Sequence, residues 1–116
     1  MVIDAGSLDL RIAIQRRDSD RGLTGEQSNE WHTVATVWAA VTPLTAKEME
    51  MSNRFTSKVD GKITIRFNRQ FASTQAVSGC RAVDVVDRRV FDLHGVINRQ
   101  REGALDIFVS EVPMAR

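Results

Sequence analysis

Residues 31–50, WHTVATVWAAVTPLTAKEME, join a long strand pattern to the start of a helix, and this stretch decides the fold. Side chains alternate between the two faces of an extended strand. The apolar side chains divide between both faces: Val34, Trp38 and Ala40 on one, and Ala35, Val37, Ala39 and Val41 on the other. One buried face requires only one apolar set, so the second set needs an explanation from the rest of the chain.

The strand pattern begins near Glu30 and ends before Pro43, because proline cannot donate a hydrogen bond to a neighbouring strand. Thr45 and Glu48 then have the spacing of a capping box, in which each side chain accepts from the backbone N–H of the other. This pattern predicts a short helix over residues 46–54.

Four other segments show strand patterns. LRIAIQRR (10–17) and KITIRF (62–67) alternate, AVDVVD (82–87) and VFDLHGVI (90–97) form a predicted hairpin, and ALDIFVSEV (104–112) follows a turn at 101–103. We expect residues 18–29 and 53–61 to be mobile loops and residues 68–80 to be irregular. The sum is one domain over residues 1–116: a mainly β, small antiparallel β-barrel or sandwich of about six strands with one short α-helix.

The outer face of the strand at 30–41 can be apolar only if something covers it. Either the predicted helix or another subunit could cover it. Another subunit is a candidate because apolar patches on soluble proteins mark partner sites. Our hypothesis is that Val37, Ala39 and Val41 pack against the helix or a neighbour, while Trp38 lies in the core.

The composition is that of an ordinary globular protein, with 116 residues, 42% hydrophobic, 27% charged and a net charge of +1. The single cysteine, Cys80, excludes an intrachain disulfide and suits a reducing compartment. The N-terminus has no signal-peptide pattern, and no apolar run is long enough to span a membrane. We expect the protein to be cytoplasmic when made.

Residues with catalytic chemistry are few. His32 and His94 have no metal-ligand spacing, and a zinc site needs about four ligands. Cys80 is expected to pack as a small hydrophobe, and Asp84 and Asp87 to shape a hairpin turn. No glycine-rich phosphate loop is present. We therefore expect no active site, no cofactor and no metal.

Nucleic-acid binding is an alternative function. Residues 54–101 carry ten cations against four acids, and an arginine-rich face on a small barrel is typical of oligonucleotide-binding proteins. However, Phe67 and Phe91 fall in phase with the aliphatic residues of their strands, which places them in the core instead of on a stacking surface.

Several segments, taken in order, resemble one protein family. They are GSLDLRIAIQRR (6–17), EWHTVATVWAAVTPLTAKE (30–48), KITIRF (62–67), RRVFDLHGVI (88–97) and ALDIFVSEV (104–112). Their order and spacing resemble the head–tail joining (head-closure, or stopper) proteins of long-tailed bacteriophages. The chain departs from that pattern in residues 68–80, and at Arg88-Arg89, where a glycine-bearing turn is expected.

The resemblance implies a small β-barrel with one helix that assembles as a sixfold or twelvefold ring below the portal and adaptor proteins. Such a ring closes the DNA-filled head, presents a surface to the tail-terminator proteins and lets DNA pass through its channel without sequence-specific binding. The implied place is the head–tail junction of the virion, after assembly in the host cytoplasm, and no membrane is involved. A tail-terminator or minor tail component is an alternative.

Partner contacts in such a ring are expected from the polar loops and from the long strand. Loops can order against a partner at the assembly step, so charged and aromatic loop residues are candidates. The predicted interface residues are Arg21, Glu26, Val37, Ala39, Val41, Arg54, Phe55 and Lys58.

Overall fold

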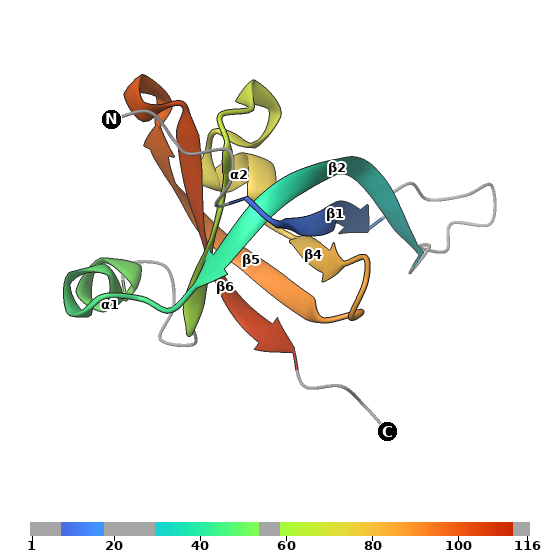
Figure 1. Cartoon of the computed structure of the whole chain (residues 1–116), viewed down its shortest axis with the longest axis horizontal. Coiled ribbons are helices and arrows are strands. Elements are labelled where there is room, and N and C mark those ends of the chain that lie inside the picture. Colours follow the sequence, from blue (N-terminus) through green and yellow to red (C-terminus); the bar gives the residue numbers. More distant parts are fainter. Residues whose placement is uncertain (1–7, 18–29, 54–58, 113–116) are drawn as a thin grey trace.

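The computed structural model describes residues 8–17, 30–53 and 59–112 (Figure 1). Its strands are β1 (Leu10–Arg17), β2 (Trp31–Thr42), β3 (Gly61–Arg66), β4 (Cys80–Asp84), β5 (Val90–Arg99) and β6 (Ala104–Val112). They form a closed barrel in the order β1-β2-β3-β6-β5-β4, in which every pair of neighbours is antiparallel. The predicted mainly β, antiparallel fold is confirmed, and the closed sheet makes it a barrel and not a sandwich.

The predicted helix after the second strand is α1 (Ala46–Ser52), and its capping box is formed. The Glu48 amide donates to Thr45 Oγ1 over 3.2 Å, and the Thr45 amide donates to Glu48 Oε1 over 3.0 Å. The helix ends at Ser52, with Asn53 as its C-cap.

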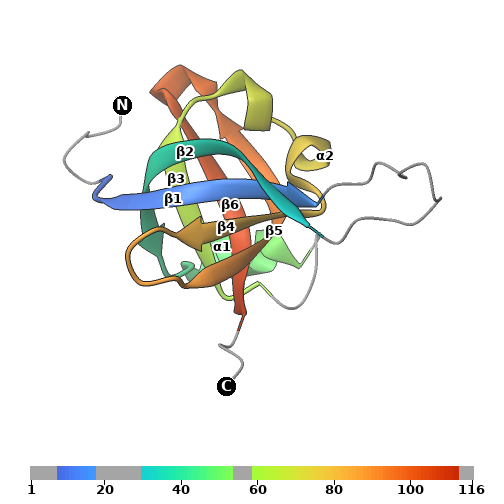
Figure 2. The ribbon, with the colours of Figure 1, turned by 90° about the vertical axis from the view of Figure 1, so that its right-hand side faces the viewer.

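Residues 68–80, predicted to be irregular, contain a 3₁₀ turn (Arg69–Phe71) and a second α-helix, α2 (Thr74–Val77). The Asn68 and Ser73 side chains cap these turns by accepting from backbone amides. Phe71 and Val77 point into the core and are fully buried. Figure 2 shows α2 beside one end of the barrel, where the Thr74 hydroxyl accepts from the Val96 amide of β5 over 3.2 Å.

The core fills the inside of the barrel with the alternating apolar side chains of all six strands. Its largest fully buried members on the strands are Phe91, Ile12, Ile14, Ile63, Ile65, Leu105 and Ile107. Phe91 is therefore in the core, as predicted, and Phe67 is half-buried against it.

The inward and outward faces of β2 are the reverse of those predicted from the sequence. Ala39 is fully buried in the core, and Val37 packs against it, whereas the Trp38 side chain is 51% exposed. The register gives the reason, because Val37 lies opposite Ile12 and Ala39 opposite Ile65, and both isoleucines point inward. The prediction that Trp38 lies in the core is wrong.

A bulge explains why Val34, which shares the sequence phase of the exposed Trp38, packs against the core. Ile14 pairs with Ala35 and Gln15 with Thr33, so Val34 is an extra residue between two paired positions. The extra residue breaks the strict alternation, and Val34 packs against the core together with Ala35. The single buried face of β2 therefore draws residues from both phases.

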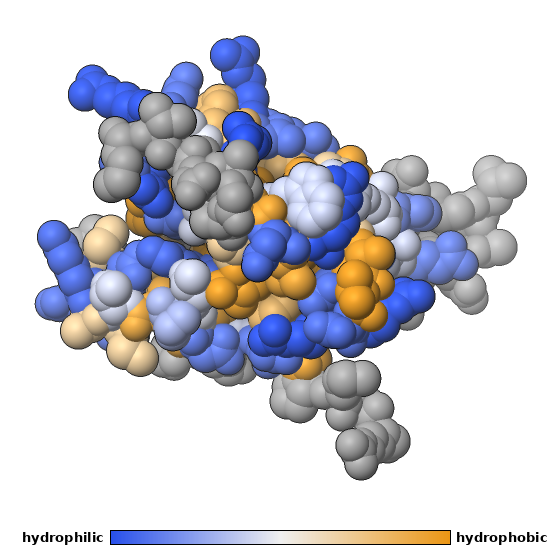
Figure 3. Space-filling view, viewed as in Figure 1, coloured by the Kyte–Doolittle hydropathy of each residue, from blue (hydrophilic) through white to orange (hydrophobic). Residues whose placement is uncertain are grey.

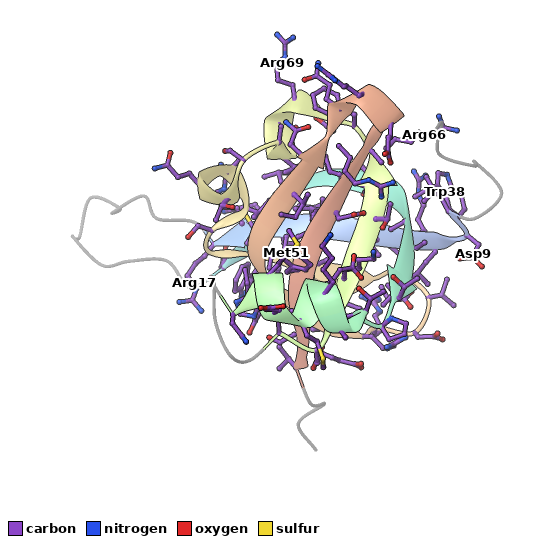
Figure 4. The ribbon with its side chains drawn as sticks, turned by 90° about the vertical axis from the view of Figure 1, so that its left-hand side faces the viewer. Asp9, Arg17, Trp38, Met51, Arg66 and Arg69 are labelled. Carbon is purple, nitrogen blue, oxygen red and sulfur yellow. The ribbon has the colours of Figure 1, made fainter. Side chains whose placement is uncertain are left out.

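Helix α1 covers a different part of the barrel's outer surface. The Lys62 ammonium of β3 forms an ion pair with Glu48 of α1, which ties the helix to this strand. Figure 4 shows α1 across the outside of the C-terminal strands, with Trp38 on another side. Phe108 of β6, which pairs with Lys62 on this outer face, is 1% exposed.

Candidate interaction surfaces

An exposed apolar area lies on the outside of β2 and at the turn between β4 and β5. Among the described residues, Trp38, Val85 and Val86 are 51%, 46% and 78% exposed. The guanidinium carbon of Arg11 lies 4.9 Å from the centre of the Trp38 ring, and the Val85 amide donates to the Arg11 carbonyl over 3.0 Å. We call these four residues the Trp38 surface.

Charged side chains surround the Trp38 surface. Since Ala39 pairs with Ile65, the next position along the register places Arg66 beside Trp38, and Figure 4 shows both side chains on the same side of the barrel. Asp9 lies on that side too. Figure 3 shows apolar side chains gathered on this face, among charged ones.

The turn that carries Val85 and Val86 is held by the Asp84 side chain. Asp84 Oδ1 accepts from the amides of Val86 and Asp87 over 2.9 and 3.2 Å, which confirms the predicted turn role of Asp84. Arg88 has a φ of +62°, in the left-handed region where glycine is preferred. This is the place where the family resemblance leads one to expect a glycine.

A second cluster surrounds Trp31 at the other end of β2. The guanidinium carbons of Arg17 and Arg81 lie 5.1 and 4.2 Å from the centre of the Trp31 ring. Arg81 Nε donates to Gln15 Oε1 over 2.8 Å, and Gln15 in turn donates to Thr33 Oγ1 over 3.2 Å. We call Arg17, Trp31 and Arg81 the Trp31 cluster.

The Trp31 cluster borders a hollow of about 590 Å³. The hollow is lined by Arg16, Arg17, Trp31, Ser78, Gly79, Cys80, Asp92, Leu93 and His94. Burial lowers the pKa of Arg81; the cross-strand carboxylate of Asp92 opposes this effect, and the positive charge of Arg17 adds to it. The net result is a pKa below the ordinary value for arginine, chiefly because burial disfavours the charged form.

The structure places the residues with catalytic chemistry in structural roles. His94 Nε2 lies 2.7 Å from Ser110 Oγ, and Cys80 is buried, with its thiol 3.7 Å from the Ala76 carbonyl. His32 is exposed on β2. Across residues 8–17, 30–53 and 59–112, no group of three or more His, Cys, Asp or Glu side chains converges to hold a metal ion. In the same ranges, no helix has the length and apolarity needed to cross a membrane.

The buried acid Asp106 belongs to a structural network on the outside of β3, β5 and β6. Arg99 Nη1 lies 3.1 Å from Asp106 Oδ2, and Thr64 Oγ1 donates to Asp106 Oδ1 over 2.8 Å. Hydrogen bonding to Glu102, which also pairs with Arg99, is the main factor that raises the pKa of Arg99. These partners satisfy a buried carboxylate and join three strands.

The structure tests only part of the predicted interface. Arg21, Glu26, Arg54, Phe55 and Lys58 lie outside the described residues. Ala39 is fully buried inside its own barrel, so it has no surface to offer a neighbour, and its prediction as an interface residue is wrong. Val37 and Val41 are half-buried against the core, and a contact between either of them and a neighbour remains a prediction.

The two clusters were not predicted from the sequence. Both sequence phases of β2 are apolar, and only the pairing with β1 and β3 shows that the phase of Trp38 faces outward. The Trp31 cluster joins β1, β2 and β4, and only the strand order brings Arg81 beside Trp31.

Two solved structures are similar to this fold. Protein SF1141 from Shigella flexneri 2a superimposes with a TM-score of 0.71 at 23% identity, covering 97% of this chain and 100% of that one. A chain from the virion of a native gene transfer agent particle superimposes with a TM-score of 0.59 at 23% identity, covering 90% and 96%. At this identity the likeness concerns the fold. A search of curated protein sequences found no significant match.

Family membership rests on a match to a protein-family sequence model and not on these two structures. A model described as phage head completion protein matches residues 3–112, which is nearly the whole chain. The chain therefore belongs to the phage head completion protein family, whose members are structural proteins of the virion.

Proposed function

We propose that the protein is a subunit of the head–tail connector, where it forms a ring that closes the DNA-filled head and docks the tail. Family membership supports this function, as does the likeness of the fold to a chain of a gene transfer agent virion. The work is mechanical, since a ring needs contact surfaces and a channel and no catalytic centre. The chain acts as one domain in this proposal.

The exposed Trp38 surface is the observation that carries the proposal. A tryptophan and two valines gathered on the outside of a barrel are disfavoured in water and are typical of a protein–protein contact. Helix α1, which is tied to β3 by the ion pair between Glu48 and Lys62, lies on another side of the barrel, so it does not cover Trp38. Of the two covers considered for this strand, we therefore favour the neighbouring subunit.

A contact between two different faces of identical subunits produces a ring when the rotation closes. We propose that the Trp38 surface is one of those two faces, in a sixfold or twelvefold ring. The portal or adaptor proteins and the tail-terminator proteins are the proposed partners above and below it. Arg21, Glu26, Arg54, Phe55 and Lys58 remain proposed contacts with them.

The channel of the ring lets DNA pass without sequence-specific contacts in this proposal. The protein would reside at the head–tail junction of the virion, after assembly in the host cytoplasm.

Electron microscopy of lysates from phage that lack this gene tests the function. The expected result is complete, separate tails beside heads that have lost their DNA, with normal particles restored by the unsubstituted gene. Normal infectious particles without the gene would refute the connector. Full, sealed heads with malformed tails would move the protein to the tail, as a terminator or minor tail component.

A further inference from the structure

The Trp31 cluster concentrates positive charge around one hollow. Arg16 and Arg17 line the hollow, and Arg81 borders it over the Trp31 ring. The Arg16 guanidinium donates to the Ala76 carbonyl over 2.9 Å, so Arg17 and Arg81 carry the charge argued from here, and Asp92 is the nearby carboxylate. Arg17 and Arg81 both lie over the Trp31 ring and repel each other electrostatically, and a bound anion would relieve that repulsion. Charge alone therefore indicates an acidic ligand.

The arginines are held in place and still have donors to offer. Gln15 fixes Arg81 through its Nε, and the Trp31 ring holds Arg17 by a cation–π contact. Within the described ranges, neither Arg17 nor the terminal nitrogens of Arg81 have a hydrogen-bond acceptor. Oriented guanidinium forks of this kind match the two oxygens of a carboxylate.

We propose that the hollow beside the Trp31 cluster binds an acidic peptide segment of another virion protein, with Arg17 and Arg81 pairing to its carboxylates. The nature of the partner rests on the proposed function, whereas the binding chemistry rests on the site. The site lies apart from the Trp38 surface, so one barrel presents an acid-binding hollow as well as an apolar contact.

Nucleic acid fits this site less well than a peptide. Base stacking needs a free aromatic face, and two guanidinium groups already lie over the Trp31 ring. Tracking a phosphate backbone needs a strip of cations, whereas these gather around one hollow that Asp92 also lines. A short acidic segment needs only a few carboxylates in one place.

Fluorescence can report on this site alone. The chain has two tryptophans and no tyrosine, so Trp38→Phe leaves Trp31 as the sole tryptophan and keeps an aromatic ring for Arg11. The probe is a hexaglutamate peptide, and hexaglutamine is the uncharged control. We expect a saturable change in Trp31 emission with hexaglutamate only. In that background, Arg81→Gln should weaken binding about tenfold or more, because hydrogen bonds to charged groups are strong.

Arg69→Gln is the matched control, because Arg69 is exposed and lies far from Arg17 in Figure 4. It should leave the affinity unchanged. Amide NMR spectra of the unsubstituted protein give a second measurement: hexaglutamate should shift Gly79 and His94, which line the hollow. Absence of both responses would overturn the proposal.

Three other results would also overturn the proposal that this site binds a partner peptide. Equal weakening by Arg69→Gln would mean non-specific charge attraction, and tighter binding of a thymidine hexanucleotide would mean nucleic acid. Binding only after Asp18→Asn and Asp20→Asn would mean that the chain's own acids compete for the site. The gene-deletion experiment is separate, so a chain that binds hexaglutamate but is absent from virions would refute only the connector.

Discussion

Arg11 and Trp38 stack across two neighbouring strands on the outside of the barrel, with the guanidinium carbon 4.9 Å from the ring centre. The contact fixes the orientation of a large side chain that is still 51% exposed. Its neighbour in sequence, Val37, points the other way and packs against the core. Two adjacent residues of β2 therefore serve different purposes, one in folding and one, by our proposal, in assembly.

The same substitution at these two positions should separate the purposes. Val37→Arg places a charge toward the barrel interior, and we expect it to lower the free energy of unfolding by at least about 2 kcal/mol. Trp38→Arg removes mainly a cation–π contact and should cost about 1 kcal/mol or less. Chemical denaturation of both variants measures this difference.

Assembly should depend on Trp38 even though folding does not. A folded Trp38→Arg protein should fail to restore infectious particles to phage lacking the gene, because the ring contact is lost. Normal complementation by Trp38→Arg would show that the Trp38 surface is not a required contact.

Most of the fold could be predicted from the sequence because its strands obey simple local rules. Strand β6 was predicted at its observed bounds, 104–112, and Thr45 and Glu48 correctly marked the start of α1. The faces of β2 could not be predicted, because both of its sequence phases are apolar and the pairing with β1 and β3 decides which one faces the core. The bulge at Val34 depends on the same pairing and leaves no local mark.

The segment 68–80 shows a different reason for a wrong prediction. Its Asn and Ser residues are typical of loops, yet here they cap two short helical turns. These turns are too short to show a helical period, and burial of Phe71 and Val77 stabilises them. Tertiary packing, which the sequence pattern does not contain, decides this segment.

Phe71 tests the importance of this segment for folding. The Phe71 side chain is fully buried, so Phe71→Ala should lower the free energy of unfolding by about 3–5 kcal/mol. Gln70→Ala, next to it and exposed, should change it by less than about 0.5 kcal/mol. If urea denaturation gave equally small changes in the free energy of unfolding for Phe71→Ala and Gln70→Ala, the segment would contribute little to the core.

Arg88 carries backbone strain in the turn that presents Val85 and Val86. With φ at +62°, a side chain costs about 1 kcal/mol relative to glycine, so Arg88→Gly should raise the melting temperature. Arg89→Gly should lower it, because Arg89 forms a two-point contact with Glu111, at 2.9 and 3.1 Å. A lower melting temperature for Arg88→Gly would show that the Arg88 side chain makes a compensating contact.

The candidate sites were harder to predict than the fold, because they lie between strands that are distant in the chain. Trp31 and Arg81 are 50 positions apart and meet only because β4 pairs with β1, which pairs with β2. The arginine-rich composition indicated contacts with acidic groups, but it gave no location for them.

The ion pair between Glu48 and Lys62 should make the stability of the barrel depend on pH. Burial alone raises the pKa of Glu48, but hydrogen bonds from Lys62 and Thr45 outweigh it, so the pKa lies below its ordinary value of 4.5. A carboxylate with a depressed pKa in the folded state stabilises the protein above the unfolded pKa, and this contribution is lost as the pH falls through the folded value.

We therefore expect Glu48→Gln to lower the free energy of unfolding by about 1 kcal/mol at pH 7, since both partners are mostly shielded from water. The difference from the unsubstituted protein should shrink steadily below pH 4.5. Glu50→Gln, at an exposed position of the same helix, is the control and should leave the acid limb of the stability curve unchanged. Urea denaturation between pH 3 and pH 7 measures both variants. A constant difference between Glu48→Gln and the unsubstituted protein over that range would mean that the ion pair does not hold α1 against β3.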